Sequence, residues 1–273
     1  TIHTRYFGPE VMRPYVDRIA AAGHDIELHV HPEWAVFEDG VARRDHPTFP
    51  LNGSLNGRSE AQVRAVLDIG LETFEHWGLH KPIALRTGSL YADLGLYRHL
   101  VAADIPISSS VGLGVRSDYP EVLRLNGGRH FLDGVLEVPV TTYTDLAVLG
   151  RTHLRPLQIT ACSADEMESV LSSAHAAGVE TVIILTHPSE YMQTRDFRYE
   201  ELTRNRVNQQ RLERLCRFLA AHPERFEAVS FRHAGPEWLR SDGEPAPELS
   251  LPTPLPVLQR LVSNRLNDSL WRY

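Results

Sequence analysis

Two histidines, His29 and His31, stand two residues apart in a segment that reads as a β-strand over residues 25–31. Side chains alternate between the two faces of a strand, so both imidazoles should lie on one face. Imidazole nitrogens bind zinc and other first-row metals, and the pair is therefore a candidate metal site. Glu33 would share this face if the strand continued, and Trp34 stands in the loop that follows, where an aromatic ring can line a sugar pocket.

Three further polar residues follow predicted strands at their carboxyl ends, where α/β barrels place their active sites. Arg86 ends a short apolar strand, and a guanidinium there can hold a carboxylate or the substrate. His187 directly follows the apolar run 181–186 and can serve as a general acid or base near neutral pH. His233, after the predicted strand 226–231, follows the same logic and is a candidate substrate contact. A solvated arginine, and histidines satisfied by hydrogen bonds within the fold, are the alternatives that these residues leave open.

The hydrophobic pattern switches repeatedly between the periods of helices and of strands, which favours a parallel α/β architecture. The expected helices cover residues 10–22, 59–77, 92–103, 163–177, 202–222 and 257–270. The expected strands cover residues 25–31, 82–86, 105–111, 136–143, 154–159, 181–186 and 226–231. Ser59 is expected to cap its helix, and Ser163 and Glu166 match a capping box. Residues 32–57 read as a long loop, of a length that in compact domains is usually functional or disordered.

The composition is that of an ordinary globular protein. Of the 273 residues 42% are hydrophobic, and the formal net charge of −7 argues against a nucleic-acid partner. No run of apolar residues is long enough for a transmembrane helix. Cys162 and Cys216 lack CxxC spacing, which argues against a disulfide framework or a thiolate zinc site. The length fits one α/β barrel over residues 1–240, followed by a proline-rich linker over 241–256 and a C-terminal helix over 257–273.

Three segments of the chain, in this order, resemble the motifs of the polysaccharide deacetylase (NodB-homology) superfamily. Gly23 and His24, followed by His29, are similar to the metal-histidine motif of that family. Residues Arg86–Tyr91 resemble its arginine motif, and Leu185–His187 resemble its late Leu-x-His motif. The run His-Val-His-Pro-Glu-Trp is similar to a subgroup found in bacterial surface-polysaccharide gene clusters.

This resemblance implies a TIM-like, distorted (β/α) barrel and a role for each matching residue. His29 would be the first metal ligand. Arg86 would orient a catalytic aspartate, and His187 would act as the general acid. Tyr91, within the arginine motif, would contact the substrate, as would Trp34.

The sequence departs from the family pattern in two ways. The second metal histidine of the family falls at Glu33 in this sequence, whereas strand geometry favours His31 as the second ligand. The Thr-Phe-Asp-Asp motif of the family's first strand, which supplies the metal-binding aspartate and the catalytic base, has no counterpart here. It would fall before Thr1, and we therefore expect the first strand to be missing from the chain as given.

The function that the resemblance implies is hydrolysis of N-acetyl (amide) groups on a carbohydrate in bacterial surface-polysaccharide biosynthesis. The reaction would depend on a divalent metal, expected to be Zn²⁺. The expected partner is an N-acetylated sugar or polysaccharide, with no nucleic acid and no membrane span, and a homo-oligomer is left open. The acidic balance leans toward a cytoplasmic location.

Three alternatives stay open at this point. Another metal hydrolase of the amidohydrolase or PHP type would also carry an HxH pair at a strand end, and metal bound jointly by His187 and His233 would favour it. A non-catalytic carbohydrate-binding protein could be built on a decayed deacetylase barrel. The histidines could also be structural in an unrelated α/β protein.

Overall fold

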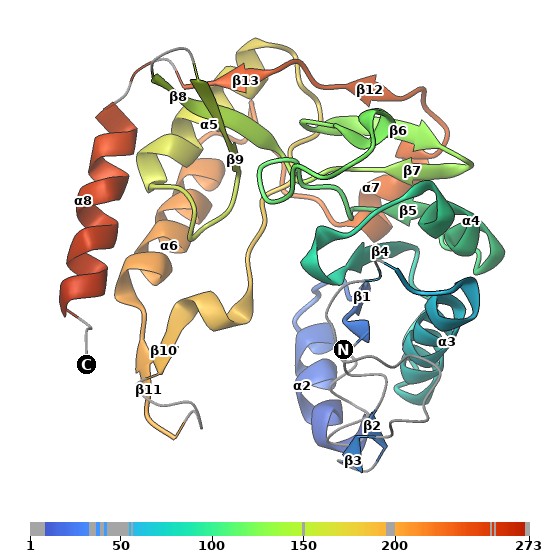
Figure 1. Cartoon of the computed structure of the whole chain (residues 1–273). Coiled ribbons are helices and arrows are strands. Elements are labelled where there is room, and N and C mark those ends of the chain that lie inside the picture. The colour runs from blue at the N-terminus through green and yellow to red at the C-terminus, as the bar shows by residue number, and fades with distance from the viewer. Residues whose placement is uncertain are drawn as a thin grey trace.

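Helices and strands alternate along most of the chain and form a mixed α/β fold (Figure 1). The computed structural model describes residues 9–32, 37–38, 41–42, 55, 57–148, 151–194, 200–251, 253 and 255–270. The helices are α2 (Pro9–Ala21), α3 (Glu60–His76), α4 (Leu94–Ala102), α5 (Ala164–Ala176), α6 (Arg206–Ala221), α7 (Phe231–Trp238) and α8 (Leu255–Leu270), with short 3-10 helices η2 (Gly88–Leu90), η3 (Glu121–Leu123) and η4 (Pro188–Tyr191). The strands are β1 (Leu28–Val30), β2 (Phe37–Glu38), β3 (Val41–Ala42), β4 (Ala84–Thr87), β5 (Ile107–Ser108), β6 (Gly128–Leu132), β7 (Val135–Glu137), β8 (Thr142–Val148), β9 (Arg151–Pro156), β10 (Met192–Thr194), β11 (Leu202–Arg204), β12 (Glu244–Pro245) and β13 (Leu249–Ser250).

The largest sheet has the strand order β1-β4-β5-β7-β6-β12. Its strands β1, β4, β5 and β7 pair in parallel, whereas β6 and β12 are antiparallel to their neighbours. The predicted α/β class with parallel strands is therefore confirmed. In the described part of the chain β1 is an edge of this sheet, so the closed barrel that the family resemblance implies is not seen there.

The helices α3 and α4 pack on β1 and β4 and form a first hydrophobic core. Its fully buried members include Leu28, Leu67, Leu85 and Leu100. The predicted cap of α3 is confirmed, because Ser59 and Gln62 each accept the other's backbone N–H in a capping box. The predicted box of Ser163 and Glu166 likewise begins α5. Both helices thus start where the sequence supplies acceptors for their first N–H groups.

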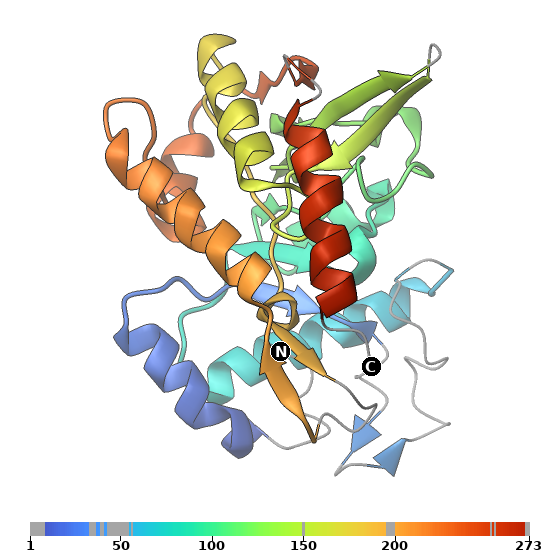
Figure 2. The same cartoon turned by 90° about the vertical axis from the view of Figure 1, so that its left-hand side faces the viewer.

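The second core lies between α5, α6 and β8, and α5, α6 and α8 lie side by side (Figure 2). Tyr143 and Met167 are fully buried in it. The helix α8 turns a charged residue toward this body: Arg260 donates to Glu166 at 2.6 Å and to Asp145 at 2.9 Å. All three side chains are at most 4% exposed, so buried ion pairs hold the C-terminal helix on the rest of the fold.

Two of the predicted strands are not strands in the structure. Within the described residues, 181–186 join a neighbouring segment through an isolated bridge between Leu185 and Gln158, without a ladder. Residues 226–231 run extended only as far as Ser230, which caps α7. An apolar run indicates burial, whereas a strand also needs a partner beside it. Residues 181–186 have such a partner only around Leu185, and residues 227–229 form no backbone–backbone hydrogen bond within the described chain.

Other element boundaries differ from the predictions for local reasons. The predicted strand 136–143 is divided between β7 and β8, and the predicted strand 154–159 overlaps β9, which is antiparallel to β8. The first residues of the predicted helix 202–222 form β11, and Asn205 caps α6. Its acceptor oxygen stops the helix from extending backward.

The residues after 240 are tied to the sheets. Within the expected linker 241–256, β12 pairs with β6 and β13 pairs with β8, before α8 begins. Among the helices of the described residues, none has the length and apolar character that crossing a membrane requires.

Substituting Arg260→Ala should lower the free energy of unfolding by about 3–5 kcal/mol, because it leaves Glu166 and Asp145 buried without this cation. Urea unfolding followed by circular dichroism measures the change. Arg217→Ala is the control, since it removes only an exposed pair with Glu213 and should cost less than about 1 kcal/mol. Equal losses for the two variants would contradict the role assigned to the buried pairs.

Candidate active site

The parallel pairing of β1 with β4 brings the predicted metal-binding segment beside the predicted arginine. In this register His29 lies opposite Arg86. The Nδ1 atom of His29 is 2.8 Å from the backbone oxygen of Arg86. A carbonyl oxygen only accepts, so Nδ1 carries the hydrogen and the ring lone pair is on Nε2. The rings of His29 and His31 lie edge to face, with centroids 4.7 Å apart.

His29 is suited to binding a cation because it is uncharged at neutral pH. Burial lowers the pKa of His29 to about 4, and the neighbouring His31 adds to this lowering. A metal ligand must be the neutral imidazole, and its second nitrogen usually donates to a carbonyl or carboxylate that fixes the ring. His29 meets both requirements.

The three segments singled out by sequence meet at one cavity. This cavity has a volume of about 270 Å³, and its lining includes His29, Arg86, Ser109, Thr186, His187 and Phe231. The predicted ligand, the predicted arginine and the predicted acid therefore border a common space. They reach it from β1, from β4 and from the extended chain that precedes η4.

Arg86 is held by Ser109, which directly follows β5. Its Nε donates to the backbone oxygen of Ser109 at 3.0 Å, and its Nη2 donates to the Ser109 hydroxyl at 2.7 Å. Burial lowers the pKa of Arg86, and the negative charge of Glu137 opposes this effect. Among the described residues, no carboxylate forms a hydrogen bond or ion pair with Arg86, so the aspartate expected from the family resemblance is not at its side there.

His187 has a carboxylate partner that sequence analysis missed. Its Nδ1 lies 2.9 Å from Oε1 of Glu190, whose side chain is only 8% exposed. Three other donors hold this carboxylate in place, from Gln158, Thr160 and Thr186. Although burial opposes ionisation, the hydrogen bonds from His187 and Gln158 hold the pKa of Glu190 below its usual value.

The signal for Glu190 was present in the sequence. Pro188 directly follows His187 and begins the one-turn helix η4, which brings the residue three positions on back to the imidazole. A histidine, a proline and a glutamate at this spacing indicate such a pair.

The other predicted site residues lie elsewhere or outside the described part of the chain. His233 does not follow a strand: it is an exposed residue in the first turn of α7, outside the cavity of His29 and His187, and its predicted strand-end position is wrong. The hydroxyl of Tyr91 donates to Asp93 at 2.6 Å, and Tyr91 does not line that cavity. Glu33 and Trp34 are outside the described residues.

The described residues include two side chains that could hold a metal. His29 and His31 fit as two imidazole ligands, but no group of three suitable side chains occurs within the described residues. Glu27, which shares their strand face in sequence, instead accepts the backbone N–H groups of Ile83 and Ala84 at 2.8 and 2.9 Å. A metal held by the two histidines would therefore need a further ligand.

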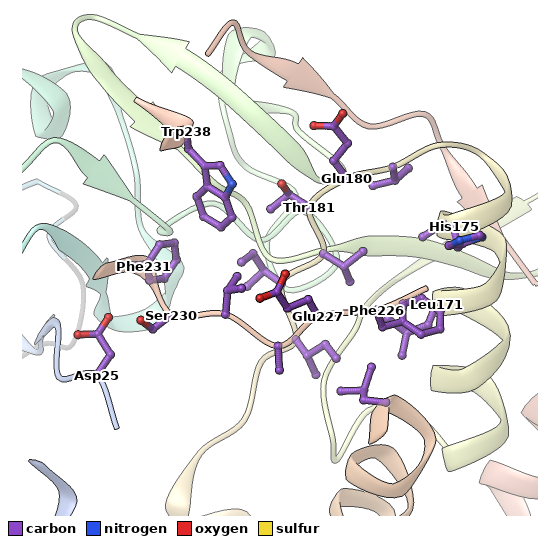
Figure 3. Close-up of a pocket in the computed structure, with 18 of the residues that line it drawn as sticks. Asp25, Leu171, His175, Glu180, Thr181, Phe226, Glu227, Ser230, Phe231 and Trp238 are labelled. Atoms are coloured by element: carbon purple, nitrogen blue, oxygen red, sulfur yellow. The ribbon is translucent and has the colours of Figure 1, made fainter. Parts of the chain in front are cut away.

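A second cavity, of about 600 Å³, lies between the residues that lead into β1 and the segments 181–184 and 225–231. Asp25 and His175 stand at opposite ends of it (Figure 3). Within the described chain, residues 227–229 form no backbone–backbone hydrogen bond. Extended backbone without partners requires acceptors and donors from another segment or from water. The space beside β1 is thus bordered by backbone that a further strand could pair with.

Comparison with known proteins gives a likeness in fold. No family model and no curated protein matches this chain. A crystal structure from Mycobacterium smegmatis, described as a "putative polysaccharide deacetylase", aligns over 91% of this chain and 74% of its own length, with 17% identity and a TM-score of 0.51. The two proteins are similar in fold. At this identity the likeness concerns the fold alone.

In the metal-free protein, the free energy of unfolding should decrease as the pH is lowered through the range in which His29 titrates. Its folded pKa of about 4 lies below the ordinary value of 6.5, so the unfolded chain takes up the proton first as the pH falls. The contribution of neutral His29 is complete above pH 6.5 and is lost as the pH approaches 4.

Urea unfolding on both sides of this range measures the effect. His29→Gln should flatten the pH dependence, whereas the exposed His80→Gln should leave it as in the wild type. The same slope in the wild type and in His29→Gln would contradict the lowered pKa.

Proposed function

We propose that this protein is a metal-dependent hydrolase that removes N-acetyl groups from a carbohydrate, in the biosynthesis of a bacterial surface polysaccharide. The observation that carries the proposal is the common cavity of His29, Arg86 and His187, with His31 beside His29. The likeness in fold to a protein described as a polysaccharide deacetylase agrees with it. The similarity of the histidine segment to the surface-polysaccharide subgroup supports the substrate class.

His29 and His31 would hold the metal, with His29 fixed by the Arg86 carbonyl. A bound divalent metal such as Zn²⁺ would lower the pKa of a coordinated water and polarise the acetyl carbonyl. His187, on the other side of the cavity, would donate a proton to the leaving amine. Glu190 would orient that imidazole through Nδ1, which leaves Nε2 to carry the proton toward the substrate.

The third ligand and the catalytic base would come from a carboxylate-bearing strand beside β1. Support comes from the second cavity, whose bordering segments 227–229 offer unpartnered backbone. A strand in this space would extend the sheet past β1 and close the barrel. Its carboxylate would then lie near Arg86, whose guanidinium would hold it ionised by charge pairing.

The geometry favours the deacetylase over an amidohydrolase or PHP-type enzyme. The latter would need His187 and His233 to bind metal together. His233 is exposed on α7 and does not line the cavity of His187. A measurement of acetate release distinguishes the deacetylase from a non-catalytic carbohydrate-binding protein with the same fold.

Substituting His187→Ala in the full-length protein should reduce acetate release from an N-acetylglucosamine oligomer by roughly 100-fold or more, because the amine then leaves without its acid. Zinc binding should stay intact, since His29 and His31 hold the metal. Acetate release is followed enzymatically, and zinc by elemental analysis.

His233→Ala is the matched control and should change neither quantity. Loss of zinc in His187→Ala would show that this residue is a ligand and not the acid. Loss of zinc in both variants would indicate the amidohydrolase arrangement. A wild-type protein that releases no acetate would indicate the binding protein.

A further inference from the structure

A buried carboxylate, Glu137, lies near Arg86 but outside the lining of the cavity, and the proposed mechanism gives it no role. Glu137 is the last residue of β7 and is 0% exposed. Its Oε1 accepts the backbone N–H groups of Ser110 and Val111, both at 2.9 Å, and its Oε2 accepts the Tyr97 hydroxyl at 3.1 Å. Burial raises the pKa of Glu137, and the hydrogen bonds from Val111, Tyr97 and Ser110 oppose that effect.

Glu137 and Arg86 form hydrogen bonds to the same short segment, residues 109–111, which follows β5. Arg86 makes both of its side-chain hydrogen bonds to Ser109, the residue directly before the two N–H groups that Glu137 binds. The Ser110 hydroxyl adds a further link, because it accepts the backbone N–H of Thr87 at 3.2 Å. Glu137 and Arg86 thus both bind residues 109–111.

Burying an ionised carboxylate costs free energy unless its charge interacts favourably with another group. Moving an ion out of water costs several kcal/mol even after relaxation, and a glutamine could accept the same two N–H groups without that cost. The nearby charge that this carboxylate stabilises is Arg86. Burial lowers the pKa of this guanidinium, and the negative charge of Glu137 opposes that effect. The strand pairing of β5 with β7 already holds the backbone at Ser108 and Glu137. A charge is therefore not needed for the fold of the strands alone.

We propose that Glu137 is the positioning residue for Arg86. Its buried carboxylate fixes residues 109–111 and balances the charge of the guanidinium at the cavity, so that Arg86 is held in one orientation. The catalytic use of that orientation rests on the proposed deacetylase function; the positioning itself does not.

Glu166 supplies a closely matched control. It is also 0% exposed, and it also accepts a backbone N–H, from Ser163, and a tyrosine hydroxyl, from Tyr143. It lies in the other core and pairs with Arg260. Glu137→Gln and Glu166→Gln therefore remove the same charge from equally buried positions, and only the first should affect Arg86.

The experiment compares the NMR signal of the Arg86 Nε–H group in the two variants of the full-length protein, with the signal assigned by its absence in Arg86→Lys. Glu137→Gln should shift or broaden this signal and lower kcat/KM for acetate release by roughly tenfold or more, as the loss of supporting groups around an active site does. Glu166→Gln should leave both unchanged.

Tyr97→Phe removes one hydrogen bond to Glu137 and keeps the charge. It should move the Arg86 signal in the same direction by a smaller amount, and it decides the question if Glu137→Gln does not fold. An Arg86 signal that is the same in wild type, Glu137→Gln and Tyr97→Phe would overturn the proposal, as would an equal shift in Glu166→Gln. A shifted signal in a protein that releases no acetate would contradict the proposed function and leave the positioning role standing.

Discussion

The parallel register of β1 on β4 is the constraint on which the candidate site depends. It sets His29 opposite Arg86, and the imidazole then donates to the Arg86 carbonyl, which leaves its other nitrogen as a lone-pair donor. A slip of one residue would turn both side chains to the opposite face of the sheet. The core residues Leu28 and Leu85, which are paired in the same register and 1% exposed each, make such a slip costly. Hydrophobic packing on one face of these strands thus fixes the positions of His29 and Arg86 on the other face.

The fold buries charge in two different ways, with different results. Arg260 donates directly to Glu166 at 2.6 Å, and this ion pair holds α8 on the second core. Glu137 instead binds the backbone of residues 110 and 111, and the neighbouring Ser109 binds Arg86. The cation in this second arrangement keeps its place at the cavity, where a ligand can reach it. A buried charge whose partner binds the same backbone segment, and does not bind the charge directly, can stabilise a fold and still leave that partner available for chemistry.

Local signals predicted much of this structure, and long-range pairing limited the rest. The capping residues Ser59 and Ser163 act within one helical turn, so their sequence patterns were sufficient. Residues 226–231 read as a strand because they are apolar, but pairing depends on a partner far away in sequence, and α7 begins there instead. His233 was misplaced for that reason. Glu137 escaped notice because it stands in an apolar strand, where only the positions of Ser110 and Val111 explain a carboxylate.

We infer that His29 and His31 form a metal site at the cavity of Arg86 and His187. Elemental analysis of the full-length protein, purified without added chelator and then dialysed against a limited zinc concentration, tests it most directly. We expect about one zinc per chain in the wild type and in His80→Ala. We expect none in His29→Ala or His31→Ala, because each of these two variants removes one ligand of a tetrahedral site. The same zinc content in all four proteins, or none in the wild type, would contradict it.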